Sequence, residues 1–288
     1  MKSAPRYNDE KLEAQFGDHV ASVERLHAWS TGKGVKVGVI DTPIDRNHPD
    51  LESRIETQEV FFSERLDSAD LVHGTAVAGI IGAQAGNGIG IVGFAPDTEL
   101  HSYAACFHRD DWQRTVCNTF SLAKALAAVA DDGIHVLNMS LAGPEDFLLA
   151  RLIDALINQG TMVVASDNPD SGALRFPASM ARVIAATRLG DTRQTSPPLI
   201  KTDDEHLTTG TGGTYQYFYG SSMSAARVTA LISLLLERNP GIDDLETRRL
   251  LADIADNCHT TFGAEDSCAM KFAISDQVVA FSMNHDHD

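Results

Sequence analysis

The sequence predicts an α/β fold: a single domain with a mostly parallel sheet and helices on both faces. Two observations lead to this prediction. Short strand-like runs alternate along the chain with longer segments of helical length, and no linker, internal repeat or low-complexity stretch interrupts the alternation. Strands that alternate with helices form parallel sheets, because each crossover helix returns the chain to the same end of the sheet.

The first expected strand, residues 35–40, is an apolar, β-branched run with the length of a buried strand. The other expected strands cover residues 98–105, 134–139, 161–165 and 182–187. The expected helices cover residues 20–29, 73–84, 119–131, 145–158, 222–238 and 243–256. Residues 189–218 are rich in Thr, Gly and Asp, which predicts loops with short edge strands.

We expect three regions: a lead-in over residues 1–19, the folded domain over 20–275 and a tail over 276–288. The two histidines of the tail are expected in a solvated terminus. The first residues show no apolar core of a signal peptide and no long pro-segment. The expectation is therefore either a processed or trimmed chain, or a protein that matures without such a segment.

Composition limits the class of partner. With 43% hydrophobic and 22% charged residues among 288, the chain resembles ordinary soluble globular proteins. The net charge of −17 argues against nucleic acid, whose phosphates require a basic face. No apolar run reaches the length of a membrane span. We therefore expect a monomer with neither a nucleic-acid partner nor a membrane span.

The expected helix at 222–238 begins at Gly220-Ser221-Ser222-Met223. A serine at a helix start lies beside unpaired N–H groups and the positive end of the helix dipole, which can stabilise an oxyanion. Serine is also a favoured N-cap, so the motif alone fits a capped core helix equally well. Ser221 is interpreted as a turn residue and Ser222 as the candidate nucleophile.

Two further residues change that interpretation. Asp41 ends the first expected strand, at the edge where α/β sheets place ligands, and His73 opens a helix of small residues that must pack closely. Each alone also fits a structural role. Together with Ser222 they supply the carboxylate, imidazole and hydroxyl that acyl transfer by serine requires.

The order Asp41, His73, Ser222 is the order known for subtilisin. The surrounding motifs, V-G-V-I-D-T, H-G-T-A-V-A-G and G-S-S-M-S-A-A, also resemble those of the bacterial type of subtilisin-like serine protease. The resemblance extends from about residue 20 to about residue 256 and implies a serine endopeptidase that forms an acyl-enzyme on Ser222. It further implies Asn168, after the strand-like run 163–167, as the side-chain donor of the oxyanion hole.

The resemblance also implies a peptide-binding segment at Ser140, Leu141, Ala142 and Gly143, and a specificity-pocket wall at residues 176–178. Protein or peptide is thus the expected substrate. The family usually has glycine where Asp167 stands, so this carboxylate either favours a cationic side chain in the substrate or points away, toward Arg175 or solvent.

Other departures from the family are Pro43, after the aspartate, and Ala226-Arg227, where proline and histidine are usual. None of these departures removes a triad member.

The chemistry requires no cofactor, but the resemblance implies a possible structural calcium ion. Its ligands are expected to be the side chains of Asp50 and Asn87 and the carbonyls of Ile89 and Ile91. The alternative is a plain glycine-rich loop.

The sequence of the same loop matches the dinucleotide-binding fingerprint G-x-G-x-x-G. That fingerprint requires a strand before it and a helix after it, whereas here a helix precedes the loop and Pro96 follows it, so nucleotide binding is excluded.

The four cysteines allow three disulfide pairings. Their short intervals favour Cys106–Cys117 and Cys258–Cys268, which implies a periplasmic or secreted protein. Cys106 and Cys117 also resemble a pair found in a subset of bacterial subtilisin-like sequences. Four free thiols and a cytoplasmic location are the alternative.

The sequence leaves two other functions open. A peptide-processing transpeptidase or ligase shares the acyl-enzyme, so the triad cannot separate it from a hydrolase. A non-catalytic peptide-binding module is expected to lack a triad or oxyanion residue, whereas all four are present.

Overall fold

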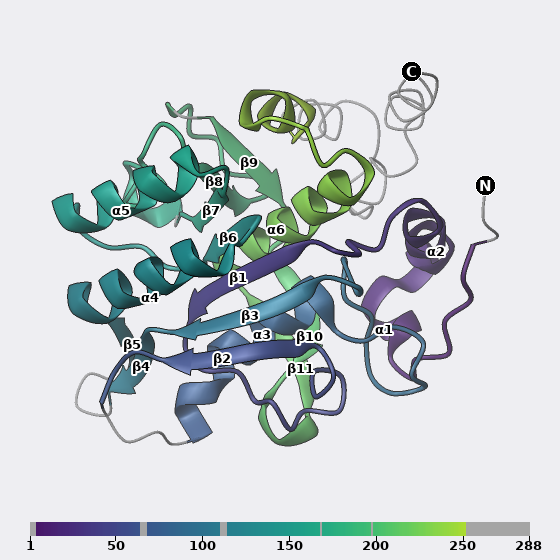
Figure 1. Ribbon diagram of the computed structural model, residues 1–288. Helices are drawn as coiled ribbons and strands as arrows, with labels where there is room; N and C mark the ends of the chain where they lie inside the picture. Colours follow the sequence, from purple (N-terminus) through teal and green to yellow (C-terminus); the bar gives the residue numbers. More distant parts are fainter. Residues whose placement is uncertain (1–3, 64–67, 110–113, 168, 197, 252–288) are drawn as a thin grey trace.

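The computed structural model describes residues 4–63, 68–109, 114–167, 169–196 and 198–251. Its centre is a parallel sheet of seven strands in the order β2-β3-β1-β6-β7-β8-β9. Figure 1 shows helices α4 and α5 on one face of this sheet, with α3 and α6 on the other. The predicted fold class is confirmed.

All five expected strands are present, within two residues of their expected ends. They are β1 (Lys36–Asp41), β3 (Glu99–Ala104), β6 (Val136–Met139), β7 (Met162–Ser166) and β8 (Ile184–Arg188). The expected helices correspond to α2 (Val20–Trp29), α3 (Val72–Gly82), α4 (Thr119–Asp132), α5 (Phe147–Asn158) and α6 (Ser221–Arg238). The helix expected at 243–256 begins at residue 244 and reaches 251, where the described part of the chain ends.

Several short elements were not predicted individually. They are α1 (Leu12–Phe16), β2 (Ile55–Val60), β4 (Cys106–Arg109) and β5 (Arg114–Cys117). The loop region 189–218 holds β9 (Leu199–Thr202), β10 (Glu205–Thr209) and the start of β11 (Tyr215–Tyr219). This agrees with short edge strands, since β9 ends the large sheet and β10 pairs only with β11.

Both faces of the central strands β1, β6 and β7 are buried, which explains their nearly continuous apolar sequences. On β1, Val37 and Val39 pack into the cluster that includes α3 and α6, whereas Ile40 packs into the cluster with α4 and α5. This alternation follows the two-residue period of a strand. The same period places Val164 of β7 on the first face and Val163 on the second.

The order of the strands also determines where the polar residues meet. Asp41 ends β1, Ser140 follows β6 and Asp167 follows β7, and these three strands are neighbours in the sheet. Because parallel strands have their carboxyl ends at one edge, the three residues lie along the same edge. Helix α6 packs on this part of the sheet, and Ser222 lies in its first turn.

Candidate active site

Asp41 and His73 are in direct contact. The Nδ1 of His73 lies 2.7 Å from Oδ1 of Asp41, which also accepts the N–H of Thr42 at 2.7 Å. The carboxylate is buried, whereas a third of the His73 side chain is exposed. A proton on Nδ1 leaves Nε2 as a free base.

The approach of the two residues depends on glycine. The first turn of α3 lies against the end of β1, where the N–H of Gly74 donates to Oγ1 of Thr42 at 2.9 Å. A Cβ atom on Gly74 would lie 2.2 Å from the Thr42 carbonyl oxygen. Gly79, further along the helix, has a similarly close neighbour in Thr209, at 2.1 Å. The small-residue pattern of α3 is therefore a packing requirement, as predicted.

Two opposing interactions act on the pKa of His73. Burial disfavours the charged imidazolium and lowers the pKa. The negative charge of Asp41 and the hydrogen bond to it together favour the charged form more strongly. The pKa of His73 therefore lies above its ordinary value.

Ser222 lies against Ser140. The hydroxyl of Ser222 donates to the Ser140 carbonyl at 3.3 Å, and the Ser140 hydroxyl donates to the Ser222 carbonyl at 3.0 Å. Asn138 of β6 donates to Oγ of Ser140 at 2.9 Å and accepts from the Thr229 hydroxyl of α6 at 3.0 Å. This buried polar chain fixes α6 on β6. We predict no role for Asn138 or Thr229 from the sequence. An amide within an apolar strand, such as Asn138, nevertheless indicates a buried side chain that requires hydrogen-bond partners.

A cavity of about 500 Å³ is lined by both Asp41 and His73. Ser140, Leu141, Ala142 and Gly143 line it as well, followed by residues 144–146. The N–H of Gly143 donates to the carbonyl of Phe176 at 2.8 Å, so the expected peptide-binding segment and the expected pocket wall are joined. Phe176 and Arg175 also line the cavity.

Asp167 is completely buried and has partners within the protein. Its Oδ1 accepts the N–H of Arg175 at 3.0 Å, and its Oδ2 lies 2.7 Å from Nη2 of Arg193. The carboxylate thus faces the backbone at Arg175, one of the two directions considered from the sequence. Asn168, the expected oxyanion-hole residue, lies outside the described residues.

The expected calcium ligands lie together, but their side-chain oxygens accept hydrogen bonds. Asp50 is buried and accepts from the Asn87 side-chain amide at 2.8 Å and from the N–H of Ile91 at 2.9 Å. The side-chain oxygen of Asn87 accepts the N–H of Ile89 at 2.8 Å. Among the described residues, no group of three or more His, Cys, Asp or Glu side chains is arranged to hold a metal ion.

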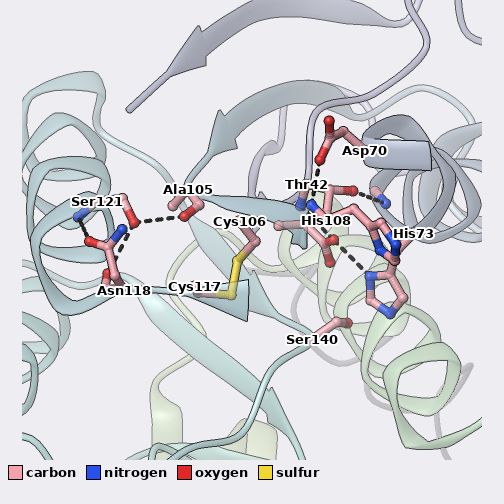
Figure 2. Close-up of a disulfide and its surroundings, with 12 residues drawn as sticks. Thr42, Asp70, His73, Ala105, Cys106, His108, Cys117, Asn118, Ser121 and Ser140 are labelled. Atoms are coloured by element: carbon pink, nitrogen blue, oxygen red, sulfur yellow. Dashed lines mark hydrogen bonds and ion pairs between the residues drawn. A yellow bond between two sulfur atoms is a disulfide. The ribbon is translucent and has the colours of Figure 1, made fainter. Parts of the chain in front are cut away.

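The hairpin of β4 and β5 also borders the cavity. Cys106 and Cys117 form the predicted disulfide between these strands (Figure 2). Both residues also line the cavity. The contact of this hairpin with the site was not predicted from the sequence. Cys258 and Cys268 lie outside the described residues.

Of the helices that the structure describes, none is long and apolar enough to cross a bilayer.

Comparisons with known proteins identify related serine proteases. The thermophilic serine proteinase of Bacillus sp. (strain AK1) is 32% identical over 250 residues, which cover 82% of this chain and 60% of that protein. Subtilisin Savinase of Lederbergia lenta is 30% identical over 241 residues, which cover 80% of this chain and 87% of Savinase. A probable subtilase-type protease of Deinococcus radiodurans is 30% identical, but this chain spans only 39% of its length.

Two solved structures show the same fold. The keratinolytic enzyme fervidolysin from Fervidobacterium pennivorans matches with a TM-score of 0.70 at 23% identity, over 88% of this chain and 44% of fervidolysin. The prenylagaramide maturation protease PagA matches with a TM-score of 0.65 at 20% identity, over 81% of this chain and 86% of PagA. The sequence pattern of the subtilase family matches residues 32–268, and the chain belongs to this family.

Proposed function

We propose that this protein is a serine endopeptidase that cleaves peptide bonds through an acyl-enzyme on Ser222. The observation that carries the proposal is the 2.7 Å contact of His73 with the buried Asp41, in the cavity that Ser140 also lines. Ser140 in turn contacts Ser222. Asp41 and His73 thus line the cavity together, and Ser140 connects it to Ser222, which would supply the hydroxyl that acyl transfer requires.

In the proposed reaction, the Ser222 hydroxyl turns from the Ser140 carbonyl toward Nε2 of His73 and then attacks the scissile carbonyl. His73 takes the serine proton and later gives it to the leaving amine, while Asp41 holds the imidazole and stabilises its charged form. Asn168 and the Ser222 N–H bind the oxyanion. Gly220 caps α6 without a side-chain hydrogen bond, which supports this role for the first turn.

The peptide substrate adds a strand along Ser140, Leu141 and Ala142. Asp167 supports the pocket indirectly in this proposal, because its pairing with Arg193 and the backbone of Arg175 holds the segment that leads to Phe176. The disulfide supports a periplasmic or secreted location.

Transfer of the acyl group to an amine shares the same acyl-enzyme intermediate. The masses of the products formed in the presence of a competing amine distinguish this transfer from hydrolysis.

Replacing the nucleophile tests the proposal. We expect Ser222→Ala to remain folded and to lose about 10⁶-fold in kcat, the size established for the nucleophile of subtilisin itself. Ser221→Ala is the matched control, one residue earlier in the same turn, and should retain turnover. Wild-type turnover in Ser222→Ala would contradict the assignment.

We also propose, independently of the catalytic mechanism, that the protein binds a structural calcium ion. The oxygen donors of Asp50, Asn87, Ile89 and Ile91 fit the chemistry of the ion, but its binding must displace the N–H donors that now occupy the two side chains. We expect calcium to raise the melting temperature of chelator-treated protein, because the ion binds only the folded form. An unchanged melting temperature would contradict the site.

A further inference from the structure

A buried amide connects strand β6 to two separate turns of helix α6. Asn138 lies within β6, and its side chain is completely buried. Its Nδ2 donates to Oγ of Ser140 at 2.9 Å, and its Oδ1 accepts the hydroxyl of Thr229 at 3.0 Å. The Ser140 hydroxyl donates in turn to the Ser222 carbonyl at 3.0 Å. One side chain therefore separates Asn138 from the nucleophile.

The amide faces α6 because of the two-residue period of the strand. Leu137 and Met139, on either side of Asn138, pack into the cluster with α4 and α5, so Asn138 points to the opposite face of the sheet. On α6, Ser222 and Thr229 are seven residues apart, which places them on the same side of the helix about two turns from each other. The amide thus fixes both the rotation of α6 and its position along its own axis.

The hydrogen bonds of this link run in one direction. The Thr229 hydroxyl donates to the amide oxygen, and the amide nitrogen donates to Ser140. In the reverse orientation of the amide, its oxygen would face Oγ of Ser140 and compete with the Ser222 carbonyl for the one hydroxyl proton. Thr229 therefore favours the orientation of Asn138 that leaves the Ser140 proton for Ser222.

Ser222 is held at its backbone as well as at its hydroxyl. The hydroxyl donates to the Ser140 carbonyl at 3.3 Å, and in the proposed reaction it leaves this carbonyl to attack the substrate. The bond from the Ser140 hydroxyl to the Ser222 carbonyl involves no reacting atom, so it persists during the attack. No side chain caps the first turn at Gly220, so this bond gives the turn a support that comes from the sheet.

We propose that Thr229 and Asn138 are positioning residues for the nucleophile, because they keep the Ser140 hydroxyl on the Ser222 carbonyl. This inference rests on the proposed function of Ser222. Both side chains are completely buried, so neither touches the substrate. Loss of the link should let Ser222 move from the position for attack, which lowers kcat and leaves substrate affinity nearly unchanged.

The first experiment compares two substitutions of Thr229. Thr229→Val keeps the shape of the side chain but removes the hydroxyl that donates to Asn138. We expect kcat to fall about ten-fold and KM for a peptide substrate to change by less than about two-fold, the pattern of an interaction made only in the transition state. Thr229→Ser keeps a hydroxyl at this position and should restore kcat to nearly the wild-type value.

Ser233 provides the matched control on the same helix. Its side chain is also completely buried, and its hydroxyl donates to the Thr229 carbonyl at 2.9 Å, outside the link to Ser222. Ser233→Ala should lower the melting temperature to a similar degree as Thr229→Val but keep the wild-type kcat. The rate of reaction with a small serine-directed phosphonylating reagent is a second readout, and it should fall in Thr229→Val alone of these two variants.

A double-mutant comparison tests whether the two residues act through one link. Asn138→Leu removes both hydrogen bonds of the amide, and we expect it to lower kcat at least as much as Thr229→Val. The double variant Asn138→Leu/Thr229→Val should lose no more kcat than Asn138→Leu alone, because the shared link is already broken.

The outcomes separate the inference from the proposed function. Wild-type kcat and a wild-type reagent rate in Thr229→Val would show that the link is only structural and would overturn the inference, as would additive losses in the double variant. If Asn138→Leu does not fold, the comparison of Thr229→Val with Thr229→Ser decides. A wild-type protein that neither cleaves peptides nor reacts with the phosphonylating reagent would contradict the proposed function instead.

Discussion

The two ends of helix α6 are stabilised in opposite ways. At the N-terminal end, Gly220 has φ 122° and ψ 164°, and no side chain caps the first turn. At the C-terminal end, one carboxylate oxygen of Glu237 accepts four hydrogen bonds of 2.7–3.0 Å. The donors are the Ser30 hydroxyl and the N–H groups of Thr31, Gly32 and Lys33. One end is left uncapped by side chains, and the other is closed by a charged group.

The uncapped end is supported from inside the protein. Arg227 is the largest fully buried side chain among the described residues, and its Nη1 lies 2.5 Å from Oδ2 of Asp203. Helical side chains point toward the N-terminus, so the guanidinium reaches back to the turn between β9 and β10. The carbonyl of Asp204 in that turn accepts the N–H of Gly220 at 2.9 Å. An ion pair between a buried arginine and a partly exposed aspartate thus supports the turn that carries Ser222.

The largest effect is expected on breaking this ion pair. Arg227→Met removes a charged hydrogen bond to Asp203, whose side chain is 29% exposed, and should lower the free energy of unfolding by about 2–3 kcal/mol. Because the β9–β10 turn holds Gly220, kcat should fall more than KM changes. Thermal unfolding and steady-state kinetics measure the two quantities. Stability lost with full turnover retained would show that Arg227 does not position Ser222.

The second-largest effect on stability and turnover is expected from replacing Gly220. The φ and ψ of Gly220 lie in a region essentially restricted to glycine, so Gly220→Ala should cost about 1–3 kcal/mol or shift the first turn. A shift displaces Ser222 from His73 and lowers kcat. Gly133 is a matched site, with φ 64° at the end of α4 and no neighbour within 4 Å of the place that a Cβ atom would take. Gly133→Ala should affect stability alone, and equal kinetic losses in both variants would contradict the argument.

The two ends of α6 also differ in what the sequence could predict. The small-residue turn before an apolar helix predicted the Ser222 end, because helix-start chemistry is local. Glu237 gave no such signal, because its partners, Ser30 to Lys33, lie about two hundred residues earlier in the chain. Arg227 was recognised only as a departure from the family. Its ion pair with Asp203 depends on how β9 and β10 turn, which no local pattern determines.

The residues around the cavity also differ in how well the sequence could predict them. Asp41 and His73 could be located because Asp41 follows a strand whose apolar run is plain in the sequence and His73 opens a helix of small residues. The 140–143 segment was implied by the resemblance to subtilisin-like proteases. The cysteine spacing predicted the Cys106–Cys117 pair, but the hairpin lacks an apolar run and was not predicted as a cavity wall. The direction of the Asp167 carboxylate depends on Arg193, 26 residues later, so the sequence left two alternatives.

A smaller effect is expected at the closed end of the helix. Glu237→Gln removes the negative charge but leaves an oxygen of similar size, so its hydrogen bonds weaken rather than vanish. We expect a loss of about 1 kcal/mol in the free energy of unfolding. Turnover should stay at the wild-type level, since Glu237 lies at the opposite end of α6 from Ser222. A fall in kcat in this variant would remove the distinction between the two ends.

The smallest effect is expected in the pH dependence of kcat/KM, which reports on the Ser222 end of α6 alone. Burial lowers the pKa of His73, but the charge of Asp41 and the hydrogen bond to it raise the pKa further, so the net shift is upward. The base must be neutral to accept the serine proton, and the neutral form prevails above the pKa. We therefore expect kcat/KM to rise with pH, with a midpoint above the value of about 6.5 for a free histidine. Glu237→Gln should keep this midpoint, because its charge lies at the other end of α6. A wild-type rate that peaks near pH 4 would contradict a histidine base.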